Sequence, residues 1–183
     1  MLKKFSIALF LNGFATFGVM AGPLEGPKTI RLHPADGDPI KVAQITFLKG
    51  SDTAYSLSYD DTLFTDHFLS MRPFKCLEGP EKLWCRVPYP YEIKRQVTGE
   101  DLTDLEYELM FVWKNQGEYG IDLWNGVYYL LAPDGDRLVG TMHEIDMNVL
   151  ASPPEDGNLR PVTEGDLEEA DEGSHWLPTL TIE

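Results

Sequence analysis

The sequence predicts a mainly β fold, an antiparallel meander that forms a small barrel or a highly curved sheet with two or three short helices. Turn residues separate short apolar runs, apolar residues alternate along those runs, and the central meander carries apolar side chains on both faces. A sheet that is covered on both sides, or closed around a lumen, accounts for the third observation. An α+β fold is the alternative.

The central stretch, residues 106–146, is predicted to form four antiparallel strands. Asn125-Gly126 favours a type I′ hairpin turn, and the residues 133–136 favour a second turn that brings Val139 opposite Leu130. The period of two assigns one face to the core, with Tyr119, Ile121, Leu123, Tyr128, Leu130 and Ala132. The reverse face is also apolar, with Trp124, Val127, Tyr129, Leu131 and Leu138, and is joined by Tyr107, Leu109, Phe111 and Trp113 if the loop 114–117 keeps the register.

The first 21 residues are typical of a secretory signal peptide. Lys3 and Lys4 precede an apolar run that is too short for a membrane-spanning helix, and small residues before Ala21 suit cleavage there. We therefore expect a periplasmic or secreted protein with a single β-rich domain, 22–183, and no stable membrane span after cleavage. An uncleaved anchor is the alternative.

The net charge of −15 argues against a nucleic-acid partner, because binding to phosphates requires a basic patch. The two lysines of the signal segment are its only charged residues, so the remainder has 13 Lys and Arg against 30 Asp and Glu. This excess favours solubility, or less often a cationic partner.

Cys76 and Cys85 are predicted to form a disulfide. Gly79-Pro80-Glu81-Lys82 is a good four-residue turn, and a hairpin folded there places the two cysteines opposite each other. An exported protein would keep this pair oxidised. Two reduced buried thiols are the alternative, and no nearby histidine supports a metal site.

The N-terminal third predicts a second meander. Strands are expected over 28–33 and 40–47, with a bulge near Ala43, and a turn at 49–52 leads into a strand that begins near Tyr55. The pattern of residues 62–71 predicts a short helix capped by Asp61, and an extended edge strand is the alternative.

The proline-rich run Val87-Pro88-Tyr89-Pro90-Tyr91 is predicted to be an edge or a connector with exposed tyrosines, because proline donates no ladder hydrogen bond. Residues 97–102 and 162–167 predict two helix starts. The acidic segment 151–175, which contains Pro and Gly, is either a solvated tail or a short docked helix. The apolar residues after it are expected to pack onto the sheet.

Catalytic and metal-binding candidates are weak. His143, Glu144 and Asp146 are the densest group of catalytic residue types, but neighbouring residues of a strand point to opposite faces. The Asp-Gly-Asp sites 36–38 and 134–136 are predicted turns, with calcium as the alternative. No nucleophile elbow, zinc motif or nucleotide-binding loop is present, so we expect no metal and no cofactor. A carboxylate-pair hydrolase leaves no short motif and stays open.

The predicted ligand-binding residues are the aromatic side chains of the central stretch, namely Tyr107, Phe111, Trp113, Trp124 and Tyr129. If their face lines a lumen, the molecule would be lipocalin-like in shape only and would bind a small apolar or aromatic ligand. The alternative is a plain filled core. A module that binds or inhibits an envelope protein is the second functional hypothesis, supported by the acidic charge and the Pro-Tyr connector.

Overall fold

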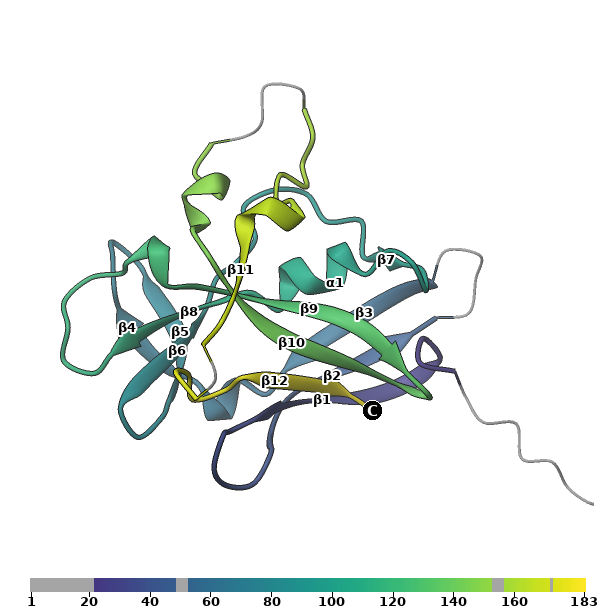
Figure 1. Ribbon diagram of the computed structural model, residues 1–183, viewed down its shortest axis with the longest axis horizontal. Coiled ribbons are helices and arrows are strands. Elements are labelled where there is room, and N and C mark those ends of the chain that lie inside the picture. Colours follow the sequence, from purple (N-terminus) through teal and green to yellow (C-terminus); the bar gives the residue numbers. More distant parts are fainter. Residues whose placement is uncertain (1–21, 49–52, 153–156, 172) are drawn as a thin grey trace, which may run out of the picture.

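The computed structural model describes residues 22–48, 53–152, 157–171 and 173–183 (Figure 1). Its strands are β1 (Gly26–His33), β2 (Ile40–Phe47), β3 (Thr53–Tyr59), β4 (Thr65–Phe68), β5 (Pro73–Glu78), β6 (Lys82–Arg86), β7 (Gln96–Val97), β8 (Phe111–Asn115), β9 (Gly126–Asp134), β10 (Arg137–Ile145), β11 (Leu167–Glu169) and β12 (Thr179–Ile182). Its helical elements are α1 (Thr103–Glu108) and the 3-10 turns Asp61–Leu63, Leu123–Asn125, Met147–Leu150 and Glu164–Asp166. The predicted fold class is confirmed.

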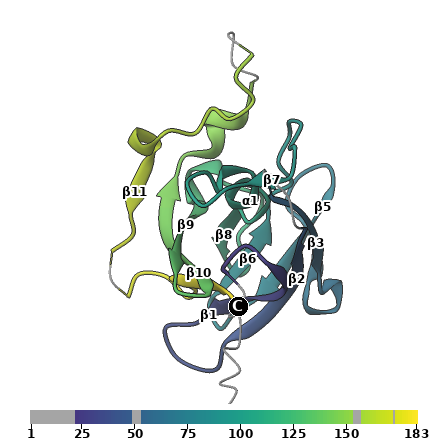
Figure 2. The same ribbon diagram turned by 90° about the vertical axis from the view of Figure 1, so that its right-hand side faces the viewer.

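The strands form one curved antiparallel sheet that does not close into a barrel. Their order is β4-β5-β6-β8-β9-β10-β12-β1-β2-β3-β7, and β11 pairs with β10 beside β12. Figure 2 shows the strands curving around a common interior, with β3 and β5 on the same side of the molecule. The sheet is therefore open between the β3–β7 end and the β4–β5 end.

The apolar residues near the C-terminus pack onto the sheet, as predicted, and there β12 joins the two meanders. It pairs with β1 on one side and with β10 on the other, so that Ile182 lies opposite both Ile30 and Leu138. All three side chains are fully buried. The acidic segment before β12 contains the capping box of Thr163 and the short strand β11.

The predicted bulge and the predicted cysteine hairpin are present. The register of β1 with β2 shifts between Ile30 and Arg31, which leaves Val42 as the extra residue of β2. In the cysteine hairpin, the Gly79 amide donates to the Lys82 carbonyl at 2.9 Å. Cys76 lies opposite Cys85, and the two form the predicted disulfide.

The hairpin of β9 and β10 turns one residue later than predicted. Asp134 pairs with Arg137, so the loop consists of Gly135, which has a positive φ of 66°, and Asp136. Val139 consequently lies opposite Ala132 and not opposite Leu130.

The prediction of four strands over 106–146 is wrong at two places. The first residues belong to α1, because the helix buries Leu105 and lets Glu106 accept hydrogen bonds from β9. Residues 118–122 form no strand, and Asn125-Gly126 is no I′ turn. Asp122 caps a 3-10 turn, and Gly126 begins β9 in the middle of the sheet.

The predicted helix over 62–71 is also wrong. A 3-10 turn capped by the Asp60 side chain comes first, and β4 follows as the terminal strand of the sheet. The alternative, an extended edge strand, is thus confirmed. Leu63, Phe68 and Met71 of the predicted helical face are exposed, so little apolar burial supports a helix.

Both faces of the sheet are covered over the first half of β9. The interior face carries Val127, Tyr129 and Leu131. On the other face, Tyr128 packs in a second cluster with Tyr107 and with Met110, Ile145, Met147 and Leu150. Further along β9 the prediction that this face belongs to the core is wrong, because Leu130 is 42% exposed and Ala132 is exposed. The chain bends away before Tyr119, which is fully exposed.

Two predictions lie outside the described residues, the signal peptide and the turn at 49–52. Within the described residues, no helix is both long and apolar enough to cross a bilayer.

Candidate functional site

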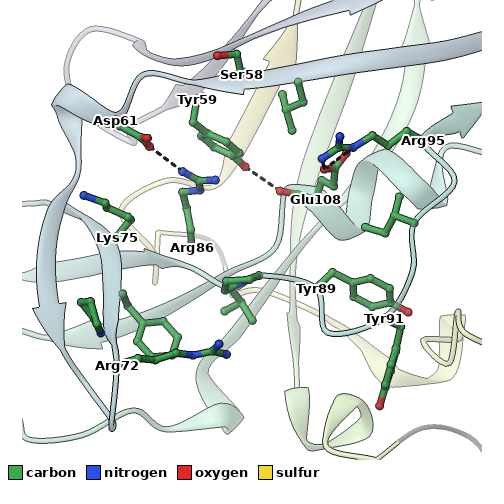
Figure 3. Close-up of a pocket in the computed structure, with 16 residues that line it drawn as sticks. Ser58, Tyr59, Asp61, Arg72, Lys75, Arg86, Tyr89, Tyr91, Arg95 and Glu108 are labelled. Atoms are coloured by element: carbon green, nitrogen blue, oxygen red, sulfur yellow. Dashed lines mark hydrogen bonds and ion pairs between the residues drawn. The ribbon is translucent and has the colours of Figure 1, made fainter.

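The opening of the sheet forms a cleft of about 780 Å³, which we call the seam cleft. One wall is the end of β3, the opposite wall comes from β5 and β6, and the chain between Val87 and Arg95 forms a third side (Figure 3). Because β7 pairs only with the first two residues of β3, no described strand pairs with the edge of β3 along the cleft. Incomplete closure of the sheet therefore creates the site.

One half of the seam cleft is cationic. Three cations reach it: Arg72 directly precedes β5, Lys75 belongs to β5, and Arg86 is the last residue of β6. The Arg86 guanidinium lies 3.5 Å from the ring centroid of Tyr59 and donates to Asp61 at 3.1 Å. This stacking and ion pair hold Arg86 in one orientation.

The other half is aromatic and is built by the Pro-Tyr connector, which forms no strand, as predicted. The rings of Tyr89 and Tyr91 meet edge to face, with centroids 5.5 Å apart. Their hydroxyls donate to the carbonyls of Leu159 and Leu150, so the rings are anchored to the C-terminal segment. Both residues are partly buried, which corrects the expectation of freely exposed tyrosines.

Backbone geometry places the end of the connector against β3. Arg95 has a φ of 57°, uncommon for a residue other than glycine. Its carbonyl accepts a hydrogen bond from Tyr55 N at 3.2 Å, and its guanidinium pairs with Glu108. Hydrogen bonding to Glu108 is the main cause of the raised pKa of Arg95.

The hydroxyl of Tyr59, the last residue of the β3 wall, stays neutral and donates to the Glu108 carbonyl at 2.8 Å. Burial is the main cause that raises the pKa of Tyr59 above its ordinary value, and Arg86 acts against it. The cleft therefore presents cations and two carboxylates beside the neutral phenol of Tyr59.

The five predicted ligand-binding aromatics do not lie together. Phe111 and Tyr129 are fully buried in the main core and contact each other edge to face, with centroids 6.3 Å apart. Trp113 packs against the edge of this core, Tyr107 belongs to the second cluster, and Trp124 is 70% exposed. Tyr107 comes closest to the seam cleft, because its ring packs against Tyr89 at 4.5 Å.

The candidate catalytic residues are separated. His143 Nδ1 lies 3.1 Å from the Thr141 carbonyl, whereas Glu144 lies 2.5 Å from Nε2 of His175, a buried residue that the sequence reasoning did not select. Asp146 caps the 3-10 turn that follows β10. These three predicted residues thus share no site.

The Asp-Gly-Asp sites lie in the loops between β1 and β2 and between β9 and β10, and the second forms the predicted turn. In the part of the chain that the structure describes, no group of three or more His, Cys, Asp or Glu is placed to hold a metal ion.

Sequence reasoning missed the cations of the seam cleft. Arg72, Lys75 and Arg86 show no motif, and only the fold brings them together with β3. The Pro-Tyr connector was the one local signal of this site. Comparisons of the chain with protein-family models, with curated proteins and with solved structures found no match.

Proposed function

We propose that this is an exported binding protein that takes a small molecule with an apolar or aromatic body in the seam cleft. The observation that carries the proposal is the cleft itself, which has about 780 Å³ of space beside the paired rings of Tyr89 and Tyr91. Clefts of roughly 300–1,000 Å³ are typical of small-ligand sites. Export is supported by the N-terminal sequence pattern and by the disulfide.

The test is a fluorescence titration of the purified protein with N-phenyl-1-naphthylamine, a neutral aromatic probe that brightens in apolar sites. We expect saturable binding that Tyr91→Ala weakens about fivefold, since one aromatic contact contributes on the order of 1 kcal/mol. Tyr91→Phe keeps the ring and should bind as the unaltered protein does. Circular dichroism of each variant checks that the fold is retained.

Two further variants decide where the probe binds. Tyr119→Ala removes a fully exposed ring outside the cleft and serves as the matched control. Trp113→Phe alters the aromatic set that the sequence predicted. Binding that responds to Trp113→Phe and ignores Tyr91→Ala would move the ligand away from the seam cleft and overturn this proposal.

A protein-interaction module is the second candidate. The observation that favours it is the terminal strand β4, whose outer edge no described strand covers and whose Phe68 is 73% exposed. Such edges are templates for strand addition. Native mass spectrometry of protein purified from the source envelope separates the two candidates, because it reports a retained small molecule or a bound partner.

A further inference from the structure

The four cations of the seam cleft differ in how far they are already neutralised. Arg95 is fully engaged, because its Nε and Nη2 donate to Glu108 at distances of 2.8–3.3 Å. Arg86 uses one nitrogen for Asp61, and Lys75 has an exposed ion pair with Asp66 at 3.0 Å. Arg72 makes no hydrogen bond or ion pair with any residue in the described part of the chain.

The charges of this cleft leave an excess of one cation. Arg72, Lys75, Arg86 and Arg95 are balanced by three carboxylates, of which Asp61 and Glu108 line the cleft and Asp66 pairs with Lys75 from outside it. The excess occurs in a chain whose net charge is −15. A cleft with an excess of positive charge favours an anionic ligand.

The arrangement in space is also asymmetric. Figure 3 shows Arg72, Lys75 and Arg86 on one side of the cleft and Tyr89 and Tyr91 on the other. A molecule with a charged end and an apolar body matches both halves at once. The planar guanidinium of Arg86, held over Tyr59, keeps donors free beyond the one that Asp61 uses.

We propose that the ligand of the seam cleft is a monoanion, an aromatic or apolar carboxylate, whose charged end is bound by Arg72 and Arg86 while its body lies against Tyr89 and Tyr91. This inference rests on the proposed function and names the ligand class. A single negative charge matches the single excess cation, whereas a phosphate dianion exceeds it. Arg72 is the residue on which recognition depends most, because its donors are uncommitted.

The experiment displaces N-phenyl-1-naphthylamine with three naphthalenes that differ in one substituent, namely 2-naphthoate, 2-naphthalenemethanol and 2-naphthyl phosphate. We expect 2-naphthoate to displace the probe at about fivefold lower concentration than the neutral alcohol, and the phosphate to be no better than the carboxylate. Raising the salt concentration should weaken only the charged competitors.

Variants assign the effect to the cationic half. Arg72→Gln should remove most of the advantage of 2-naphthoate and leave the affinity for the alcohol unchanged, and Arg72→Lys should restore part of it. Arg137→Gln, which alters an exposed arginine of the β9–β10 hairpin, is the matched control and should have no effect.

The outcomes separate this inference from the proposed function. Probe binding with equal displacement by 2-naphthoate and the alcohol overturns the carboxylate inference and leaves the proposed function standing, as does an Arg72→Gln variant that weakens both competitors equally. Stronger displacement by the phosphate would overturn the monoanion inference and indicate a dianionic ligand. If neither the probe nor 2-naphthoate binds, as measured for the latter by calorimetry, both proposals fail.

Discussion

Glu106 is the buried carboxylate that connects helix α1 to strand β9. It is 5% exposed, and it accepts hydrogen bonds from the Tyr128 hydroxyl at 2.5 Å and from Leu131 N at 2.8 Å. Burial raises the pKa of Glu106, and these two hydrogen bonds act against burial. The folded state therefore holds the proton more tightly than the unfolded state does.

Glu106 should contribute to the dependence of stability on pH. When the pKa of a carboxyl is higher in the folded state than in the unfolded state, its full contribution to stability is present at pH values below the unfolded-state pKa. This contribution is lost as the pH rises through the folded-state pKa. We expect Glu106→Gln to remove that decline, which amounts to about 1.4 kcal/mol for each unit of pKa difference. Urea unfolding at several pH values between 4 and 8 measures it. A constant difference between variant and wild type across this range would contradict the prediction.

Position 126 requires glycine because the backbone of β10 approaches it closely, and not because the chain turns there. Its φ is −68°, and a Cβ at this position would lie 2.4 Å from the Ile145 carbonyl oxygen. Glycine suits a hairpin turn because it lacks a side chain. The same property lets Gly126 fit close to β10 here. Local sequence alone could not separate the two explanations.

Gly126→Ala should destabilise the protein by about 2 kcal/mol, since the strand must shift to admit the methyl group. Gly99→Ala is the control, because a Cβ there meets nothing within 4 Å. Thermal melting of both variants tests the contrast, and equal melting temperatures would show that β9 accommodates the methyl group.

At the scale of elements, the disulfide of the cysteine hairpin is a local cross-link between β5 and β6. Cys76 and Cys85 are both fully buried and are nine positions apart. The sequence predicted this element completely, because the turn, the register and the disulfide depend only on neighbouring residues.

Replacing both cysteines with alanine should lower the free energy of unfolding by about 2.5 kcal/mol, the loop-closure entropy expected for a short disulfide loop. Denaturant unfolding with and without reductant measures this. Reductant should bring the wild type close to the variant and leave the variant unchanged. Coinciding curves for the oxidised wild type and the variant would contradict the expectation.

Where tertiary contacts decided between helix and strand, sequence reasoning was wrong. The alternation of residues 106–113 suited a strand, and residues 111–113 do belong to β8, yet residues 106–108 belong to α1, which buries Leu105 and Glu106. Residues 62–71 show the opposite error. Of their predicted helical stripe only Phe64 is buried, whereas Leu63, Phe68 and Met71 are exposed, and β4 pairs with β5 at the end of the sheet.

At the scale of the whole molecule, β12 holds the two meanders in one sheet. Leu180 lies opposite Leu32 of β1 and Gly140 of β10, and it is fully buried. Leu180→Ala should therefore cost about 2–4 kcal/mol, whereas Leu130→Ala, at a position that is 42% exposed, should cost less than about 1 kcal/mol. Chemical denaturation of the two variants provides the comparison, and similar losses would mean that β12 is dispensable.

The fold class followed from the sequence, whereas the candidate site did not. Alternation, turn residues and an even number of cysteines are local properties. The seam cleft instead depends on where a curved sheet stops, which brings Tyr59 near Arg72 and Arg86 without any motif. Four of the five aromatic residues that the sequence selected pack in or against the buried clusters.

The place of β12 between β1 and β10 also determines the order of events during synthesis. Ile30 gains its β12 partner, Ile182, only when residue 182 has left the ribosome, although β1 is the first of the described strands to emerge. Until then both meanders have an open edge, and the hydrogen-bonded sheet is incomplete. For a chain exported as we propose, this delay would favour translocation, because a polypeptide that folds late can still be threaded through a channel.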